Sequence, residues 1–280
     1  MSDHHVERVD DPASWREAAT PFFARDPLRS TIPMTVMTAP GFDAQSGLEL
    51  FRVLTATGDA CLYALRTPPF SLVLALGPPE GAAALAGRRD LLVPEAELPG
   101  VTGPITLVDA FATAYEHASN RRRRSQTELR LHALERLIRP RAPIGRGRLA
   151  AAPDAAALSV FFEGFAREVH MPPDPGLRAR LDRGIIDAKI YVWEVDGELV
   201  SVAQHSDSVF GWSRVRLVYT PPTHRGKGYA AACVAMTSEA AMASGGGACL
   251  FTDLSNPTSN ALYRRLGYEP AGDYREVLFT

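Results

Sequence analysis

Residues 215–243 constrain the fold of this chain more than any other segment. Residues 215–220 are rich in branched and aromatic side chains and predict a strand, while the alanine-rich stretch up to residue 243 predicts a long helix. The turn between them holds Gly226 and Gly228, which lack a Cβ atom and let another group approach the backbone closely. The segment therefore predicts a strand, a glycine-containing turn and a helix in direct succession.

Such a turn favours anion binding. The first N–H groups of a helix have no partner inside the helix, and the helix dipole adds positive potential there. Arg225 and Lys227 contribute two further positive charges. Two cations, close-approach glycines and several N–H donors fit a pyrophosphate better than a single carboxylate.

Two other phosphate-binding motifs fit this turn less well. The pattern Gly226-x-Gly228-x-x-Ala231, with Asp253 ending a later strand, also matches the dinucleotide fingerprint and would imply NAD. That fold places the turn after its first strand and needs several further β-α units, for which about 50 residues leave no room. A Walker A loop is excluded because no Gly-Lys-Ser/Thr follows a first glycine at the required spacing.

A second motif follows the next predicted strand. Asn256 suits a helix N-cap, Pro257 the first helical position and Gly267 the residue that ends the helix. Tyr263 lies seven residues after Asn256, about two helical turns, so both project from one face of this helix. Taken alone, Tyr263 would be read as a core aromatic residue.

Together the two motifs resemble the GNAT superfamily of N-acyltransferases, over roughly residues 145–280. Arg225 to Ala230 fit its R/Q-x-x-G-x-G/A signature, and the element order β-α-α-β-β-β-α-β-α-β read along this half also matches. The resemblance implies acetyl-CoA as the acyl donor. It also implies that Tyr263 is the catalytic acid that protonates the departing thiolate. The cofactor-binding residues that it implies are Val218, Tyr219 and Thr220 for the pantetheine backbone contacts, Arg225, Gly226, Lys227, Gly228, Tyr229 and Ala230 for the pyrophosphate, and Asn256 for the pantetheine arm.

The first half contains a weaker version of the same pattern. A strand at residues 72–76 is followed by Gly77-Pro-Pro-Glu-Gly, without the paired cations or the glycine spacing of the later turn. We expect an α/β fold of two tandem GNAT-like domains, each a mixed, mainly antiparallel sheet flanked by helices. Residues 1–140 would form a degenerate domain without a cofactor site, and residues 145–280 the acetyltransferase domain. The Pro-, Gly- and Arg-rich residues 139–147 are the predicted linker.

No general base stands out. The predicted strand at 215–220 carries no carboxylate, a common place for the base in this family, and five residues remain undifferentiated: Glu168, His170, His205, Asp207 and His224. Two functions therefore stay open. One is acetyl transfer to a primary amine of a small molecule or peptide, and the other is a non-catalytic module that binds acyl-CoA.

Composition excludes several other classes. With 30 Lys and Arg against 32 Asp and Glu, the net charge of −2 argues against general binding of nucleic acid or of an anionic membrane. The run Arg121 to Arg124 is interpreted as a solvated loop. No apolar stretch approaches the roughly 20 residues of a membrane helix. Three scattered cysteines and no secretory signal indicate a cytoplasmic protein without a disulfide framework, and no metal site is expected. The oligomeric state is not predicted.

Overall fold

The computed structural model describes residues 4–39, 41–42, 47–92, 98–172, 176–243 and 246–280. Its internal contacts divide the chain into two compact units. Unit 1 comprises Met1–Leu131, Asp253–Ser255 and Ala271–Thr280, and unit 2 comprises His132–Thr252 and Asn256–Pro270. In the described residues, no helix is long and apolar enough to cross a membrane.

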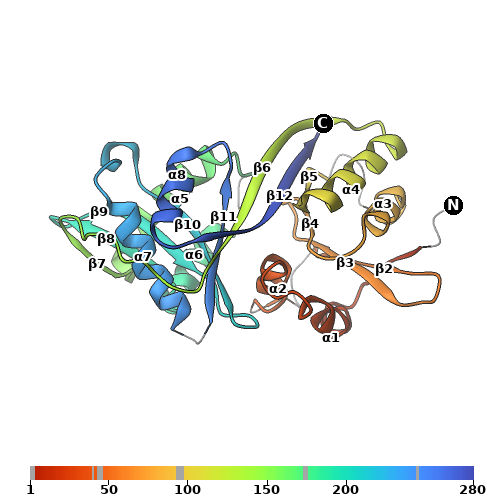
Figure 1. The fold of residues 1–280 in the computed structure, drawn as a ribbon, viewed down its shortest axis with the longest axis horizontal. Coiled ribbons are helices and arrows are strands. Elements are labelled where there is room, and N and C mark those ends of the chain that lie inside the picture. Colours follow the sequence, from red (N-terminus) through yellow and green to blue (C-terminus); the bar gives the residue numbers. More distant parts are fainter. Residues whose placement is uncertain (1–3, 40, 43–46, 93–97, 173–175, 244–245) are drawn as a thin grey trace. The chain divides into compact units, whose positions relative to one another are not determined.

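Unit 1 is built on a mixed sheet in which β1 to β5 follow one another and β12 pairs with β5 (Figure 1). All these pairings are antiparallel except that of β4 with β5. The elements are β1 (His5–Arg8), α1 (Pro12–Phe23), α2 (Thr31–Met37), β2 (Glu49–Leu54), β3 (Ala60–Arg66), β4 (Leu72–Leu74), α3 (Pro79–Gly87), β5 (Gly100–Pro104), α4 (Ile105–Ala118), β6 (Arg123–Leu134) and β12 (Glu269–Phe279).

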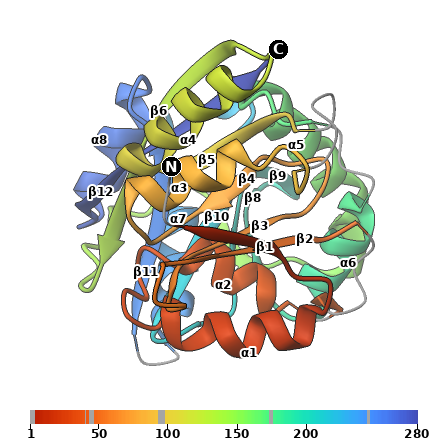
Figure 2. The ribbon, with the colours of Figure 1, turned by 90° about the vertical axis from the view of Figure 1, so that its right-hand side faces the viewer.

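Helices cover both faces of the unit 1 sheet, as the view in Figure 2 shows. Alternate residues of a strand point to opposite faces. Leu62 and Ala64 of β3 accordingly belong to the core beneath α3 and α4. Tyr63 lies between them in sequence and packs edge-on against Trp15 of α1, at 5.8 Å between ring centroids. Successive side chains of β3 thus contribute to the apolar packing on opposite faces of the sheet.

Unit 2 repeats this architecture. Its sheet runs in the order β7-β8-β9-β10-β11, antiparallel except between β10 and β11. The elements are β7 (Arg146–Leu149), η3 (Ala152–Asp154), α5 (Ala155–Glu168), α6 (Leu177–Ile186), β8 (Ile190–Val195), β9 (Glu198–His205), β10 (Trp212–Tyr219), η4 (Pro222–His224), α7 (Tyr229–Met242), β11 (Gly247–Asp253) and α8 (Pro257–Arg265), before β12. One core joins the sheet to α7 and α8, and another joins it to α5 and α6.

The order β-α-α-β-β-β-α-β-α-β therefore occurs twice along the chain, each time with a parallel pair at the same place. This confirms the predicted fold class of two tandem domains, each with a mixed, mainly antiparallel sheet and flanking helices.

The boundaries differ from the linear division at residues 140 and 145. Residues 132–144 belong to unit 2, and the last ten residues, Ala271–Thr280, belong to unit 1. The physical reason is strand pairing: Tyr274 to Leu278 of β12 pair with Pro104 to Gly100 of β5, so the chain returns to complete the first unit's sheet. Part of the predicted linker is also ordered, since Arg146–Leu149 form β7 against β8.

Candidate functional site

The predicted strand, turn and helix occur in unit 2 as β10, η4 and α7. Gly226 and Gly228 adopt φ values of 77° and 87°, a left-handed conformation that favours glycine. A Cβ at Gly226 would meet nothing within 4 Å, and one at Gly228 only the Pro143 side chain, at 3.7 Å. The Ala232 N–H donates to the Gly228 carbonyl at 3.1 Å, so the N–H groups before it precede the intrahelical ladder. The turn offers an open backbone surface at a helix start.

The Arg225 side chain lies folded against the end of β10. Its Nε donates to the Thr220 carbonyl at 2.8 Å, and its Nη2 lies 2.5 Å from Oε1 of Glu168 at the end of α5. The guanidinium also lies 5.9 Å from the centroid of the Tyr219 ring. Both cations in the turn are exposed, but Arg225 is already paired with Glu168 of α5, whereas no described residue forms an ion pair with Lys227.

Strands β10 and β11 separate beside this turn. Their parallel register covers Trp212 to Arg214 of β10 and ends there. Beyond it, the pairing of β10 with β9 is irregular between Arg216 and Tyr219, and Leu217 adopts a φ of 54°, rare for a residue with a branched side chain. A bulge of this kind bends a strand and interrupts its ladder. The backbone of residues 215–219 is thus turned away from β11.

The end of β10 is held from the β9 side. Ser201 Oγ of β9 donates to the Tyr219 carbonyl at 3.3 Å and lies 2.9 Å from Thr220 Oγ1. Tyr219 passes so close to α5 that a Cβ on Gly164 would lie 2.5 Å from its hydroxyl. These contacts fix Tyr219 and Thr220, which lie beyond the last residue of β10 in register with β11.

Asn256 is the N-cap of α8, as predicted. Its side chain accepts a hydrogen bond from the Ser259 N–H at 3.0 Å. A chain of side-chain contacts lies behind this cap: Asn260 Nδ2 donates to the Asn256 carbonyl at 2.8 Å, and Thr252 Oγ1 of β11 donates to Asn260 Oδ1 at 2.7 Å. Nε2 of the buried His132 lies 3.1 Å from Thr252 Oγ1. Because the Thr252 hydroxyl proton is directed to Asn260, His132 Nε2 is the donor in that contact.

Tyr263 of α8 is buried. It packs against Tyr268 at 5.7 Å between ring centroids, in the same core cluster as Val215 and Val218 of β10. Burial raises the pKa of the Tyr263 phenol well above its usual value, so the phenol stays protonated at neutral pH. The sequence placed Tyr263 and Asn256 on one helix, but only the structure connects that helix to β11 through Thr252.

The comparison with protein families agrees with this geometry. Residues 159–268, which run from within α5 past the end of α8 and include the turn, match the family described as "Acetyltransferase (GNAT) family". This segment is a GNAT domain. No curated protein has a significant sequence match to the chain.

Solved structures extend the likeness of fold to the whole chain. A GNAT-family acetyltransferase from Colwellia psychrerythraea superimposes with a TM-score of 0.62 at 11% identity, over 99% of this chain and 100% of the other. A GCN5-related N-acetyltransferase from Sphaerobacter thermophilus gives 0.61 at 18% identity, over 100% and 95%. A tandem GNAT protein from the clavulanic acid biosynthesis pathway gives 0.57 at 14%, over 98% of each chain. At these identities the similarity concerns the fold alone.

The five possible bases of the GNAT domain differ in their surroundings. Glu168 is paired with Arg225, His224 Nε2 lies 3.2 Å from Glu198, and Asp207 lies 2.7 Å from Lys189 Nζ. His170 is exposed. His205, at the end of β9, is buried and its Nδ1 lies 2.9 Å from the Ser206 carbonyl. A carbonyl only accepts, so Nδ1 carries the proton and Nε2 the lone pair. Loss of hydration on burial lowers the pKa of His205.

Unit 1 has a different turn at the corresponding place. After β4, Pro78 caps α3 and Pro79 begins it, and proline has no N–H to donate. The N–H groups of Gly81 and Ala82, after Glu80, already donate to the Pro78 carbonyl at 3.1 and 3.3 Å. Glu80 in the first turn opposes an anion by its own charge. This helix start is poorly suited to phosphate.

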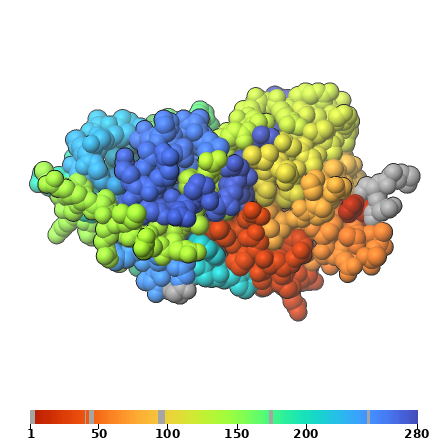
Figure 3. All heavy atoms as spheres, viewed as in Figure 1, coloured from red at the N-terminus to blue at the C-terminus, as the bar shows by residue number. Residues whose placement is uncertain are grey.

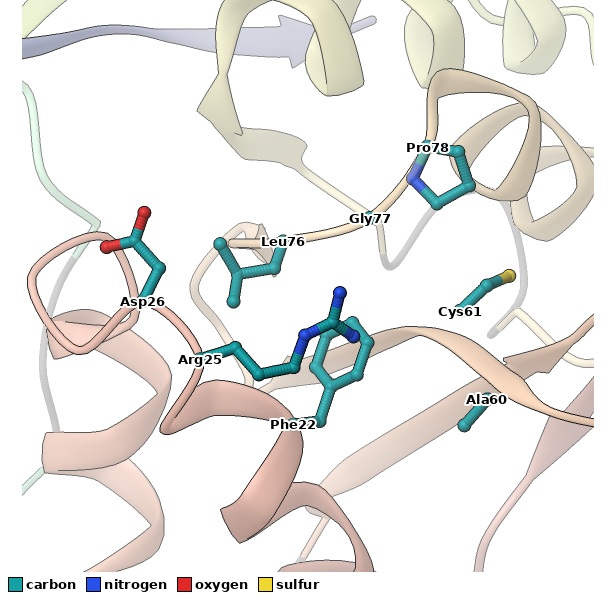
Figure 4. Close-up of a pocket in the computed structure, with 8 residues that line it drawn as sticks. All are labelled: Phe22, Arg25, Asp26, Ala60, Cys61, Leu76, Gly77 and Pro78. Carbon is teal, nitrogen blue, oxygen red and sulfur yellow. The ribbon is translucent and has the colours of Figure 1, made fainter.

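A cavity of about 610 Å³ adjoins that turn (Figure 4). The guanidinium of Arg25 lies in it, 5.0 Å from the centroid of the Phe22 ring. The cavity is lined by Phe22, Arg25, Asp26, Ala60, Cys61, Leu76, Gly77 and Pro78. Within the ranges that the structure describes, no three His, Cys, Asp or Glu side chains gather to hold a metal ion.

Proposed function

We propose that unit 2 is an acetyl-CoA-dependent N-acetyltransferase that acts on a primary amine of a small molecule or peptide. One observation about β10 carries the proposal. Its register with β11 ends at Arg214, and the end of the same strand leads into the open turn before α7. Both the start of α7 and α8 reach the surface on the face of unit 2 drawn in Figure 3.

In this proposal the turn binds the pyrophosphate of CoA. The N–H groups from Gly226 to Ala230 donate to phosphate oxygens, and Lys227 adds a charge-assisted contact. Arg225 acts mainly through position, because its guanidinium holds the turn on Thr220 and Glu168. This assigns Arg225 a more structural role than the sequence motif alone would give it.

The pantetheine arm would lie along the free edge of β10. Its amides would pair with the backbone of Val218, Tyr219 and Thr220, where the bulge has turned the strand from β11. Asn256 would contact the arm from the start of α8. The thioester would then lie near the point of strand separation, close to Arg216.

The reaction is a direct transfer. The amine nitrogen forms a bond to the acetyl carbonyl carbon, the carbon–sulfur bond breaks, the nitrogen loses one proton and the thiolate gains one. We assign the Tyr263 hydroxyl as the donor of the proton that the thiolate gains, because burial keeps this phenol protonated. We assign Nε2 of His205 as the acceptor of the proton that the amine nitrogen loses, because the lowered pKa of His205 keeps the imidazole neutral at pH 7.

A second function is supported by one observation. Glu168, Asp207 and His224, three of the five acid–base candidates, are each paired with another side chain. If His205 does not serve as the base, the domain would bind acyl-CoA without transferring the acyl group.

One assay separates these functions. Free CoA thiol released from acetyl-CoA is measured over a panel of amines, amino acids, peptides and aminoglycosides, with CoA binding measured by calorimetry on the full chain. The transferase predicts binding together with amine-dependent thiol release. Binding without release from any amine supports the binding module, and tighter binding of NAD than of CoA contradicts both.

The variant Gly228→Val is the matched negative control for this assay. A Cβ at this position conflicts with φ near 87° and obstructs the approach of a phosphate to the backbone. Gly197→Val in the hairpin between β8 and β9, where φ is 83°, introduces similar backbone strain away from the turn. Only the first should abolish CoA binding.

A further inference from the structure

Arg180, Arg214 and Arg216 lie on the side of the unit 2 sheet that α5 and α6 cover, and the charges of the first two act on Arg216. A Cβ placed on Gly184 of α6 would lie 3.0 Å from Gln204 Nε2, so this face of α6 packs on the side of β9 from which Gln204 projects. Arg216 of β10 is the direct partner of Gln204 in the register and therefore projects from the same side. Arg180 precedes Gly184 by four residues on α6, which places it on the helix face turned toward Arg216.

Arg214 is the third member. It precedes Arg216 by two residues and shares its side of β10. Arg214 is the last residue of β10 in register with β11, opposite Cys249, and Arg216 is beyond the separation. The cations therefore flank the place where the two strands part.

Electrostatics within this group favour an added negative charge. Loss of hydration, then repulsion from Arg214 and Arg180, lowers the pKa of Arg216 to about 10, which leaves it charged at neutral pH. Asp207 is the carboxylate that opposes this shift, and its Oδ1 lies 2.7 Å from Lys189 Nζ. Among the residues that the structure describes, no hydrogen bond or ion pair engages the Arg216 guanidinium. Although the surrounding protein reduces the hydration of the Arg216 guanidinium, the residue keeps an exposed surface that a ligand can reach.

We propose that Arg216, with Arg180 beside it, binds an anionic group of the acyl acceptor, so that the substrate is a small amine that carries a carboxylate or a phosphate. This inference rests on the acetyltransferase function proposed above. A guanidinium presents a planar set of donors that matches both groups in a bidentate manner. An ammonium group without an anion gains no such contact and is repelled by the charge of Arg216.

The position of Arg216 fits an acceptor contact. Thr220, next to the phosphate-binding turn, and Arg216 are four residues apart on β10, about 13 Å at roughly 3.3 Å per residue. A donor that extends from the turn along β10 brings its thioester toward Arg216. An acceptor held there by its anion presents its amine to that thioester at the place where β10 and β11 part.

The test uses matched pairs of acceptors with the full chain. Glycine is compared with glycinamide, alanine with ethylamine, and glucosamine 6-phosphate with glucosamine, with release of CoA thiol as the readout. We expect kcat/KM to be at least about 10-fold higher for the anionic member of a pair. The amino acid pairs report a carboxylate, and the sugar pair reports a phosphate.

Two variants connect the preference to Arg216. Arg216→Gln should raise KM for the anionic acceptor about 10-fold or more and change kcat and the calorimetric affinity for CoA little. Arg216→Glu should reverse the preference within each pair. Arg178→Gln is the matched control, because Arg178 lies on the same helix as Arg180 and is paired with Asp182 at 2.9 Å. Melting temperatures and CoA binding show that each variant is folded.

The outcomes separate the two proposals. Thiol release from neutral or cationic amines with no preference for the anionic members overturns the anion site and leaves the transferase intact. An anion preference that persists in Arg216→Gln also overturns the assignment to Arg216. Absence of release with every amine overturns the acetyltransferase itself, and the acceptor site with it.

Discussion

Nε of Arg225 donates to the Thr220 carbonyl at 2.8 Å, across the turn that separates β10 from α7. The same guanidinium reaches Glu168 on α5, so one side chain joins the end of the strand, the turn and a neighbouring helix. In a turn that must keep its N–H groups exposed to bind phosphate, the backbone cannot hold itself in place by its own hydrogen bonds. A side chain supplies that restraint.

Arg225→Met should therefore weaken both the fold and CoA binding. We expect the free energy of unfolding to fall by about 1 kcal/mol, because a charged hydrogen bond and a half-exposed ion pair are lost. Lys227→Met should weaken CoA binding at low salt without a change in melting temperature. Calorimetry and thermal unfolding of both variants make the comparison. Equal losses of stability in the two would contradict the restraint assigned to Arg225.

Only one CoA should bind per chain. The start of α3 in unit 1 has two prolines and Glu80 where unit 2 offers glycines and cations, so it has fewer N–H donors and repels an anion. Calorimetric stoichiometry with the full chain checks this. Two CoA molecules bound per natural chain, and one still bound in Gly228→Val, would show that unit 1 binds CoA as well.

Tyr263→Phe should lower kcat about 100-fold, the lower end of general acid catalysis, and leave CoA affinity nearly unchanged. The phenyl ring keeps the contact with Tyr268 while the proton donor is lost. The deficit should shrink with thioesters of more acidic thiols, which leave more easily without a proton.

Tyr268→Phe is the control for this experiment, because the Tyr268 hydroxyl lies 2.7 Å from Ser238 Oγ within the core. It should lose stability and keep its kcat. Full activity in Tyr263→Phe would return Tyr263 to a purely structural role, and a collapse of CoA affinity would make its hydroxyl a cofactor contact.

Thr252→Val should destabilise the domain by about 1–3 kcal/mol. The change is nearly isosteric, but it removes the hydroxyl that accepts from His132 and donates to Asn260, and both partners lie behind the N-cap of α8. Denaturant unfolding measures the loss. The exposed Thr106→Val on α4 should cost little by comparison, and an equal loss in both would show that the chain of contacts contributes nothing specific.

Stability should decline as the pH falls below 6.5. Burial lowers the pKa of His205 in the folded state, so between this lowered pKa and the value of about 6.5 in the unfolded chain, the unfolded state binds more protons. Unfolding thus becomes easier as the pH falls through this window. Melting temperatures from pH 8 to pH 5 should decline less in His205→Gln than in the natural protein. The exposed His117→Gln should follow the natural protein, and identical curves for all three would contradict the assignment.

The sequence by itself determined the local elements that carry the proposed chemistry. Gly226 and Gly228 adopt positive φ because a strand must turn into a helix within a few residues, and Asn256 caps α8 because its side chain reaches the N–H of the third helical residue, Ser259. Such features depend on neighbours in the chain, so residue type and spacing suffice to predict them. The order of elements in residues 145–280 was predictable for the same reason, whereas the first half was expected only as a degenerate copy.

Only the tertiary structure decided which groups meet. Strand β12 pairs with β5 rather than remaining in the second domain, because hydrogen-bonding edges are satisfied without regard to distance along the chain. Arg225 lies on Glu168 and Arg216 shares a layer with Arg180, although 57 residues separate the first pair in sequence. No periodicity encodes these contacts, since they depend on which face of each helix packs on which side of the sheet. For that reason the turn that would bind the cofactor could be predicted from its residues, whereas the assignment of the base and the acceptor site required the fold.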